Sequence, residues 1–137
     1  MTQDGPRGVV LLTLDALRAD HLSSFGYSRE TTPFLDRMIE ENLSFHRAYS
    51  ASSHTREAVP ALLTGHNPIA FAQQGFTLSR ESLADVLQDR GFATGGFHSN
   101  PYVSRAYGFD SGFDEFYDDL ILGKNKLLAL FQTALNK

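Results

Sequence analysis

The sequence predicts an α/β fold with a mostly parallel sheet, and two observations carry this prediction. First, GVVLLTL at 8–14 is a continuous apolar run rich in β-branched residues, typical of a strand that is buried on both faces. Second, strand-like and helix-like segments alternate along the 137 residues, without internal repeats or a domain linker. Sheets of this kind place their active sites at the carboxyl ends of the strands.

A polar loop follows the first strand, and a helix is predicted after it. Thr31 or Thr32 can cap this helix, and Pro33 fits its first position. The alternation of apolar and polar residues in LSFHRAY, 43–49, predicts a second strand. The apolar face of the helix would consist of Phe34, Leu35, Met38 and Ile39.

The next predicted helix is short and covers residues 56–64. It ends at Gly65, and Pro60 inside it removes a backbone donor, so the helix should be short or bent. Ser79 is the expected cap of a further helix that ends at Gly91. The buried face of that helix would present Leu83, Val86 and Leu87.

The rest of the chain is predicted to contain one strand, one loop and one helix. FATGGFHS, 92–99, reads as a third strand whose small residues permit close packing, and His98 could line a site from its end. Residues 101–119 are expected to form a loop rich in Tyr, Phe, Gly and Asp. The tail KNKLLALFQTALNK, 124–137, is predicted to be an amphipathic helix.

Composition excludes several classes of function. The net charge of −4 leaves no strongly basic face, so no nucleic-acid partner is expected. The absence of Cys excludes disulfides and thiolate metal sites, so any metal must be held by Asp, Glu, His, hydroxyl or backbone oxygen. The apolar run at 8–14 is too short to span a membrane, and the polar residues before it lack the features of a signal peptide. We therefore expect no membrane partner and a cytoplasmic location.

Two positions could carry chemistry. Asp15 directly follows the first strand, where a metal or phosphate site would lie, although Asp is also a common turn residue. Thr55 directly precedes a helix, whose first N–H groups and positive dipole end can hold a phosphate or sulfate group. A Thr at this position is also an ordinary N-cap, so neither residue alone decides between the two interpretations.

A family resemblance gives the two positions more weight together. It is carried by LTLDALRADHLSSFGYSRETTPFLDRMIEENLSFHRAYS, then TREAVPALLTG, then GFATGGFHSNPYVSRAYGFDSGFDEFYDD, which cover most of residues 8–119. In order and spacing these pieces resemble the N-terminal part of the sulfatase family, within the alkaline phosphatase superfamily. The resemblance implies a three-layer α/β/α fold, of which 1–137 would be the N-terminal portion only. It also implies a metal-dependent hydrolase or transferase that acts on small-molecule sulfate or phosphate esters.

The resemblance leaves two candidates for the nucleophile. SSHTR, 52–56, is similar to the sulfatase motif whose first residue becomes formylglycine, with Ser52 first and Arg56 last, but His54 stands where the family has Pro or Ala. Alignment on LLTG instead places the nucleophile at Thr55, and this register is favoured. Threonine serves in this role in phosphoethanolamine transferases and in nucleotide pyrophosphatase/phosphodiesterases. Arg56 is the accompanying catalytic candidate.

The metal site implied by the resemblance is incomplete in this sequence. Asp15 matches the first metal ligand of the family and Thr55 would be a second, while Ala16 stands where another Asp often follows. The divalent ion expected is calcium, magnesium, manganese or zinc. The remaining family ligands lie in a later part that is absent from these 137 residues, so this chain alone is expected to be inactive.

Because several family ligands are missing from this sequence, rival hypotheses remain open. One is a non-catalytic α/β module that retains an anion pocket at Thr55, and another is a truncated or structural subunit whose partner supplies the remaining half. A narrow sheet with an uncovered edge also predicts self-association through that edge or through an apolar patch. Such a patch would include the apolar side of the tail, with Leu127, Leu128, Leu130, Phe131 and Leu135.

Overall fold

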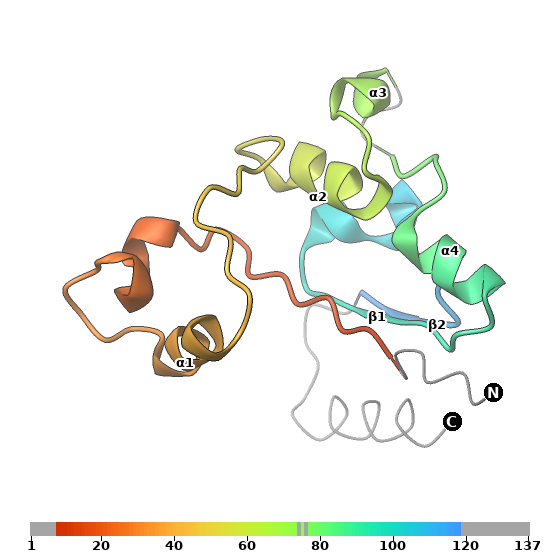
Figure 1. Ribbon diagram of the computed structural model, residues 1–137. Coiled ribbons are helices and arrows are strands. Elements are labelled where there is room, and N and C mark those ends of the chain that lie inside the picture. Colours follow the sequence, from red (N-terminus) through yellow and green to blue (C-terminus); the bar gives the residue numbers. More distant parts are fainter. Residues whose placement is uncertain (1–7, 74, 76, 119–137) are drawn as a thin grey trace, which may run out of the picture. The chain divides into compact units, whose positions relative to one another are not determined.

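The computed structural model describes residues 8–118 apart from residues 74 and 76 (Figure 1). The chain divides into two compact units, Met1–Tyr49 and Ser50–Lys137. The predicted helix at 124–137 lies outside the described residues, and so does its apolar face. None of the helices in the described part is long and apolar enough to cross a membrane.

The described part of the first unit, residues 8–49, contains one α-helix and two short turns of 3-10 helix. The turns η1 (Ala19–His21) and η2 (Ser23–Phe25) precede the helix α1 (Pro33–Glu41). The prediction of α1 is confirmed, with Thr32 as the N-cap residue and Pro33 in the first turn. No side chain within residues 8–49 is fully buried.

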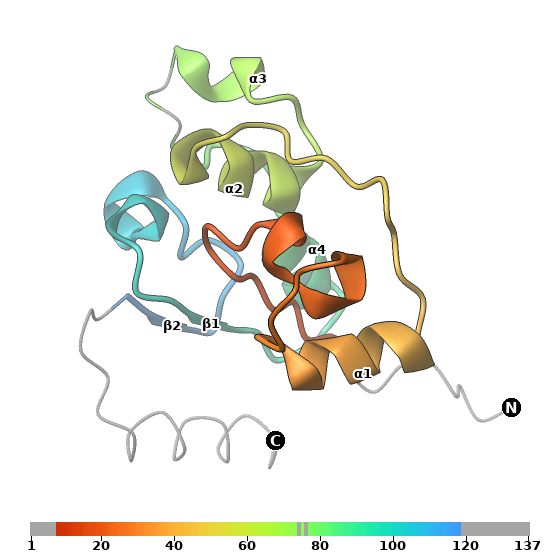
Figure 2. The same ribbon diagram turned by 90° about the vertical axis from the view of Figure 1, so that its left-hand side faces the viewer.

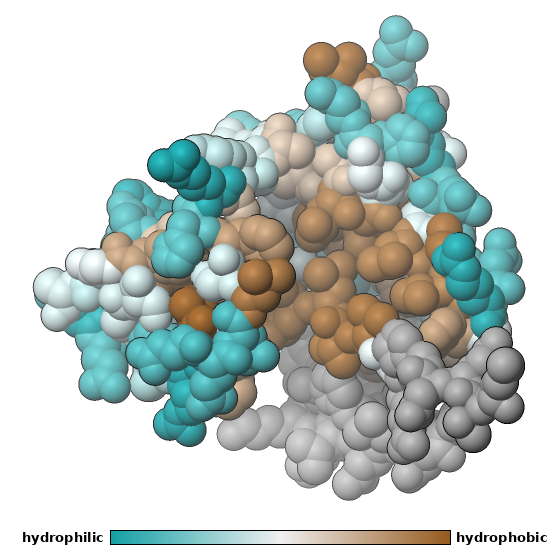
Figure 3. Space-filling view, viewed as in Figure 1, coloured by the Kyte–Doolittle hydropathy of each residue, from teal (hydrophilic) through white to brown (hydrophobic). Residues whose placement is uncertain are grey.

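The two strands predicted in the first unit are wrong. Residues 8–14 and 43–49 carry no strand among the residues that the structure describes. A strand exists only through its ladder of hydrogen bonds to a neighbour, and high β-propensity cannot replace that neighbour. Several apolar side chains of these segments are exposed, and the space-filling view shows apolar residues at the surface (Figure 3). The exposed large apolar residues of the two segments are Val9, Val10, Leu11, Leu12, Leu14, Leu43, Phe45 and Tyr49.

The apolar face predicted for α1 is also not buried within the described residues. Phe34 is 69% exposed and Met38 is 48% exposed, while Leu35 and Ile39 are half-buried. What holds α1 to η2 is a polar cluster around Asp36, whose carboxylate accepts hydrogen bonds from the backbone N–H of Ser24 at 3.0 Å and from its hydroxyl. The first unit is therefore organised by local polar contacts.

The second unit contains a small parallel sheet, and its described α-helices lie on one side of the two strands (Figures 1 and 2). β1 (Gly95–Phe97) and β2 (Glu115–Tyr117) pair in parallel, with Gly96 opposite Phe116. This pair confirms the parallel α/β prediction at the level of a fragment, and β1 lies inside the strand predicted at 92–99. The helical segments in the described part of this unit are α2 (Thr55–Thr64), α3 (Ile69–Ala72), α4 (Leu83–Asp89), η3 (Pro101–Val103) and η4 (Arg105–Tyr107).

Strand β2 was not expected, because it lies within the predicted loop at 101–119. Three residues are too few to show a period, so only the pairing with β1 makes this segment a strand. The pairing in turn depends on Gly96, because a Cβ atom there would lie 2.7 Å from the ring of Phe116. The buried ring of Phe116 thus lies across a position where only glycine fits.

A compact apolar core fills the second unit. Leu78, Phe109 and Phe116 form its buried centre, and Phe109 is only 1% exposed. Phe71 of α3 is completely buried as well. Partly buried side chains from α2, η3, η4 and the segment before β2 pack against this centre, namely Val59, Leu63, Val103, Tyr107 and Phe113.

The predicted ends of α2 are nearly correct. Gly65 ends the helix in the left-handed conformation with φ of 70°, as expected. Pro60 lies inside the helix and is buried. The start differs by one residue, because His54 is the N-cap and Thr55 is already helical.

The cap predicted for α4 is wrong, since Ser82 and not Ser79 begins this helix. Ser82 and Asp85 form a reciprocal capping box, in which the Ser82 N–H donates to the Asp85 carboxylate at 2.7 Å. This later start also changes the buried face: Ala84 is buried, whereas Leu83 is 41% exposed. Gly91 follows the helix with φ of 80°, which agrees with the predicted end.

Candidate functional site

The start of α2 positions the favoured nucleophile. Thr55 is the first helical residue and is half-buried, and the backbone carbonyl of His54 accepts the N–H groups of Glu57 and Ala58 at 3.2 and 2.9 Å. The first amides of a helix have no partner inside the helix, and they carry the positive end of its dipole. The Thr55 hydroxyl therefore lies at the end of the helix that attracts anions. Arg56, the next residue, is exposed.

Ser52, the alternative nucleophile, is part of the turn before α2. Its hydroxyl oxygen accepts a hydrogen bond from the backbone N–H of His54 at 3.2 Å. Its carbonyl accepts a hydrogen bond from the Ser50 hydroxyl at 2.6 Å. Ser52 thus stabilises the turn that leads into the helix, whereas Thr55 belongs to the helix start itself.

Asp15 lies in an exposed turn of the first unit. The next residue, Ala16, has φ of +57° and is the one described non-glycine residue with positive φ. The left-handed conformation costs a residue with a Cβ atom about 1–2 kcal/mol, and strained backbone of this kind gathers at functional sites. Asp15 is followed by strained backbone, but it does not end a described strand.

Arg18, Asp20 and His21 brace the loop after Asp15. The Arg18 Nε–H donates to Asp20 Oδ1 at 2.9 Å, and His21 Nδ1 lies 3.0 Å from the same oxygen. These contacts, Arg18 first and His21 second, lower the pKa of Asp20 to about 2. The Thr31 hydroxyl donates to the His21 carbonyl at 2.7 Å and so ties the far end of the loop to η1.

The described residues do not form a metal site by themselves. Within residues 8–118, gaps excepted, no three His, Asp or Glu side chains are grouped as ligands of one ion. Asp15 and Thr55, the two predicted ligands, belong to different units of the chain. Two ligands fix a divalent ion poorly, so a complete site would need groups from beyond these residues.

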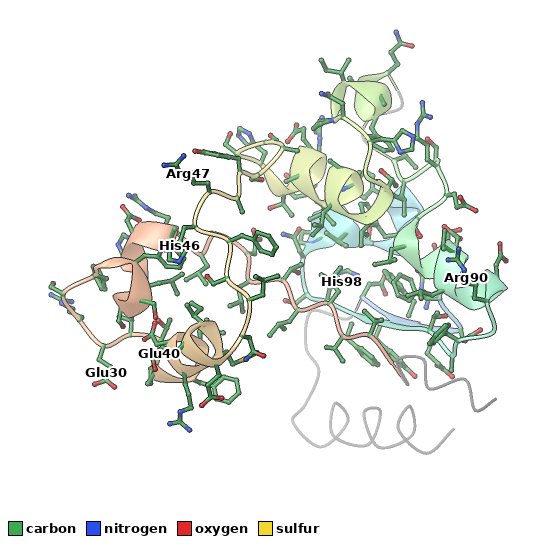
Figure 4. All side chains as sticks on the ribbon, viewed as in Figure 1. Glu30, Glu40, His46, Arg47, Arg90 and His98 are labelled. Atoms are coloured by element: carbon green, nitrogen blue, oxygen red, sulfur yellow. The ribbon has the colours of Figure 1, made fainter. Side chains whose placement is uncertain are left out.

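A further polar site lies at the carboxyl ends of the parallel strands. His98, which is labelled in Figure 4, directly follows β1. Asp118 directly follows β2. The His98 N–H donates to the Tyr117 carbonyl at 3.1 Å, so the ladder continues to this point. Since side chains alternate along strands, His98 and Asp118 lie on the same side of the sheet as the buried pair Gly96 and Phe116.

The surroundings of His98 favour a neutral imidazole. Both ring nitrogens are buried. The ring packs against Phe116, with centroids 5.1 Å apart. This burial lowers the pKa of His98, while the negative charge of Asp118 and a hydrogen bond with the backbone of Asn100 oppose the shift.

Asp118 is held in place by Arg105 at the start of η4. Its carboxylate accepts the backbone N–H of Arg105 at 3.2 Å, and the Arg105 guanidinium lies 3.9 Å away. The same guanidinium donates to the Phe116 carbonyl and contacts Asp110 at 3.3 Å. The sequence pattern pointed to the end of β1, but it missed Asp118 because it did not predict β2.

Comparison with known proteins matches most of this chain to one family. A family model described as Sulfatase matches residues 7–126. Bovine arylsulfatase A is 31% identical over 100 residues, which is 66% of this chain and 20% of that protein. Human N-acetylgalactosamine-6-sulfatase is 29% identical over 132 residues, which is 82% of this chain and 25% of that protein.

A relative with a different name also matches. The protein named "Putative transferase YhbX" of Escherichia coli K12 is 26% identical over 85 residues, 62% of this chain and 15% of that protein. The chain therefore spans a quarter or less of the length of these three relatives. No solved structure matches.

Proposed function

Since this chain belongs to the sulfatase family, we propose that it is the N-terminal portion of a sulfatase-like enzyme that hydrolyses small-molecule sulfate esters. The family match over residues 7–126 is the observation that carries this proposal. The complete domain would have the three-layer α/β/α architecture, to which the parallel pair β1–β2 belongs. Phosphate esters are a second candidate substrate class, because the favoured nucleophile is a threonine, the residue that phosphoethanolamine transferases and nucleotide pyrophosphatase/phosphodiesterases use in this role.

In the proposed reaction, Thr55 is the nucleophile at the anion-attracting start of α2. Its hydroxyl oxygen bonds to the sulfur or phosphorus while the bond to the ester oxygen breaks. The hydroxyl proton is released and the departing oxygen takes up a proton to become an alcohol, so that a covalent Thr55 intermediate remains. The helix amides and the neighbouring Arg56 would hold the negative oxygens of the transferred group. Water then attacks the intermediate and releases sulfate or phosphate.

A divalent metal ion is proposed as the cofactor of the complete enzyme, with Asp15 and Thr55 among its ligands. Such an ion would withdraw charge from the substrate oxygens and lower the pKa of a bound hydroxyl group. Because the described residues do not complete a site for it, the remaining ligands would have to come from outside them. Asp15→Asn is expected to weaken binding of calcium or zinc to the full-length protein, measured by calorimetry.

The proposal can be tested by turnover in the full-length protein. Aryl sulfates, phosphate monoesters and phosphate diesters would each be screened with calcium, magnesium, manganese or zinc. Thr55→Ala should abolish the observed turnover, because no oxygen remains to attack. Ser52→Ala is the matched control and should retain most of it, since the Ser52 hydroxyl only accepts a turn hydrogen bond.

Two outcomes would contradict this assignment. If Ser52→Ala loses turnover while Thr55→Ala keeps it, Ser52 is the nucleophile and the alignment in which Ser52 begins the motif is the correct one. Binding of sulfate or phosphate without turnover of any ester would favour the non-catalytic anion-binding module.

A further inference from the structure

We propose that Glu57 is a further ligand of the divalent cation that would bind beside Thr55. This inference rests on the proposed function and deepens it, because it assigns a carboxylate to the metal site that the sequence patterns did not indicate. Glu57 is half-buried and lies in the first turn of α2, two residues after Thr55.

The Glu57 side chain lacks a partner inside the protein. Its Oε2 atom is buried and has no hydrogen-bond partner in the described part of the chain. None of the ion pairs that the described residues form with one another includes Glu57. Buried carboxylate oxygens in proteins are hydrogen-bonded, paired with a cation or bound to a metal, because leaving water without such a partner is costly. Glu57 therefore needs a positive partner that these residues do not supply.

A comparison with α4 shows that the usual structural role of such a residue is already excluded. Glu57 and Asp85 each occupy the third position of their helix. In α4 the Asp85 carboxylate accepts the N–H of the N-cap residue Ser82 at 2.7 Å, which completes a capping box. In α2 the corresponding N–H belongs to His54, and it donates to the Ser52 hydroxyl at 3.2 Å instead. The turn before α2 thus occupies the group that would otherwise hold Glu57.

Glu57 and Thr55 project from the same end of α2. The Glu57 N–H donates to the His54 carbonyl at 3.2 Å, so the backbone of this first turn is fixed. The Cα–Cβ bonds of a helix lean toward its N-terminus, and both side chains therefore extend toward the start of α2. A carboxylate and a hydroxyl oxygen are hard ligands, which suit calcium, magnesium or manganese. One helical turn thus offers two oxygen donors to such an ion.

The proposed reaction also requires that the charge of Glu57 be compensated. The sulfate or phosphate group would bind at the start of α2, where the Glu57 carboxylate would repel it. A divalent cation bound by Glu57 would remove this repulsion and attract the anionic substrate to Thr55. The remaining ligands would come from outside the described residues, within which no three His, Asp or Glu side chains are grouped around one ion.

The test measures metal binding directly, without turnover, in the full-length protein. Mn²⁺ is titrated into the metal-free protein and followed by calorimetry and by electron paramagnetic resonance. Glu57→Gln keeps the length of the side chain and removes its charge. Its dissociation constant for Mn²⁺ should rise by at least about tenfold, since even residues that only orient a metal ligand contribute about 10–100-fold.

The matched control is Asp85→Asn, which changes the acidic residue at the same position of α4. This variant should melt at a lower temperature because its capping box is weakened, yet it should bind Mn²⁺ as the wild type does. Mn²⁺ should raise the melting temperature of the wild type and of Asp85→Asn, because it binds the folded state. In Glu57→Gln this rise should be smaller, while the melting temperature without metal should not fall.

Two results would overturn the role of Glu57 alone. One is an unchanged Mn²⁺ affinity in Glu57→Gln. The other is a Glu57→Gln variant that is unfolded, or that melts lower than the wild type without metal, since either would show that Glu57 has a structural partner elsewhere in the protein.

The same measurements separate this inference from the proposed function. If the wild type binds Mn²⁺ more tightly than Glu57→Gln but turns over no ester, Glu57 is a metal ligand and the proposed enzyme activity is refuted. If Thr55→Ala abolishes turnover while Glu57→Gln binds Mn²⁺ normally, the proposed function stands and the inference fails. A wild-type protein that binds no divalent ion would refute both the proposed cofactor and this ligand.

Discussion

The two units of the chain differ in what holds them together. The second unit has an apolar core around Phe109 and Phe116, and its parallel strands meet over that core. The first unit has no fully buried side chain among its described residues, although it contains the most apolar run of the chain. Its order comes from polar clusters around Asp20 and Asp36. Among the described residues, apolar segments therefore form a core only in the unit where distant parts of the sequence pack against each other.

The largest expected difference concerns truncation of a Phe side chain in each unit. Phe109→Ala should lower the free energy of unfolding by about 3–5 kcal/mol, because it removes a buried ring and leaves a cavity. Phe34→Ala on α1 should change it by less than about 0.5 kcal/mol, because that ring is 69% exposed. Urea unfolding of both variants, followed by circular dichroism, measures the two effects. A comparable loss in Phe34→Ala would show that α1 is covered by residues outside the described part.

A smaller difference is expected between the two helix caps. Ser82→Ala should destabilise the protein by about 1 kcal/mol, because the capping box is lost and the half-buried Asp85 N–H loses its partner. Thr32→Ala should cost less than half as much, since Thr32 makes no cap bond to the backbone of α1. Thermal unfolding and amide exchange at the first turns of α4 and α1 compare the two. The Thr32 hydroxyl donates to the Asp36 carboxylate at 3.3 Å, and equal losses would mean that this hydrogen bond replaces a backbone cap.

The smallest expected effect is a dependence of the first unit on pH. Hydrogen bonds from Ser24 lower the pKa of Asp36 below its ordinary value of 3.8. The stabilisation is therefore present above that value and is lost as the pH falls through the lowered pKa of the folded state. In Asp36→Asn, α1 and η2 should exchange their amides faster near neutral pH and lose the acid-dependent step. Glu40→Gln on the same helix is the control, and an acid step that persists in Asp36→Asn would assign it to another group.

Helix ends could be predicted from the sequence because their signals are local. Pro33 begins α1, Gly65 ends α2, and Gly91 follows α4, as each residue type and its neighbours indicated. The start of α4 was missed because two Ser residues precede it, and only the contact between Ser82 and Asp85 selects one of them. The family was also predicted correctly, because it can be identified from the order and spacing of several motifs along the chain.

Strands could not be predicted in the same way, because a strand depends on a distant neighbour. The run at 8–14 has ideal composition and forms no strand among the described residues, whereas the three residues of β2 form one beside Gly96. The residues of the candidate site show the same difference between local signals and contacts with distant segments. Sequence alone indicated Thr55 at a helix start, Asp15 after an apolar run, and His98 after a strand. Only the parallel pairing of β1 with β2 places Asp118 beside His98, since that proximity depends on hydrogen bonds between segments about twenty residues apart.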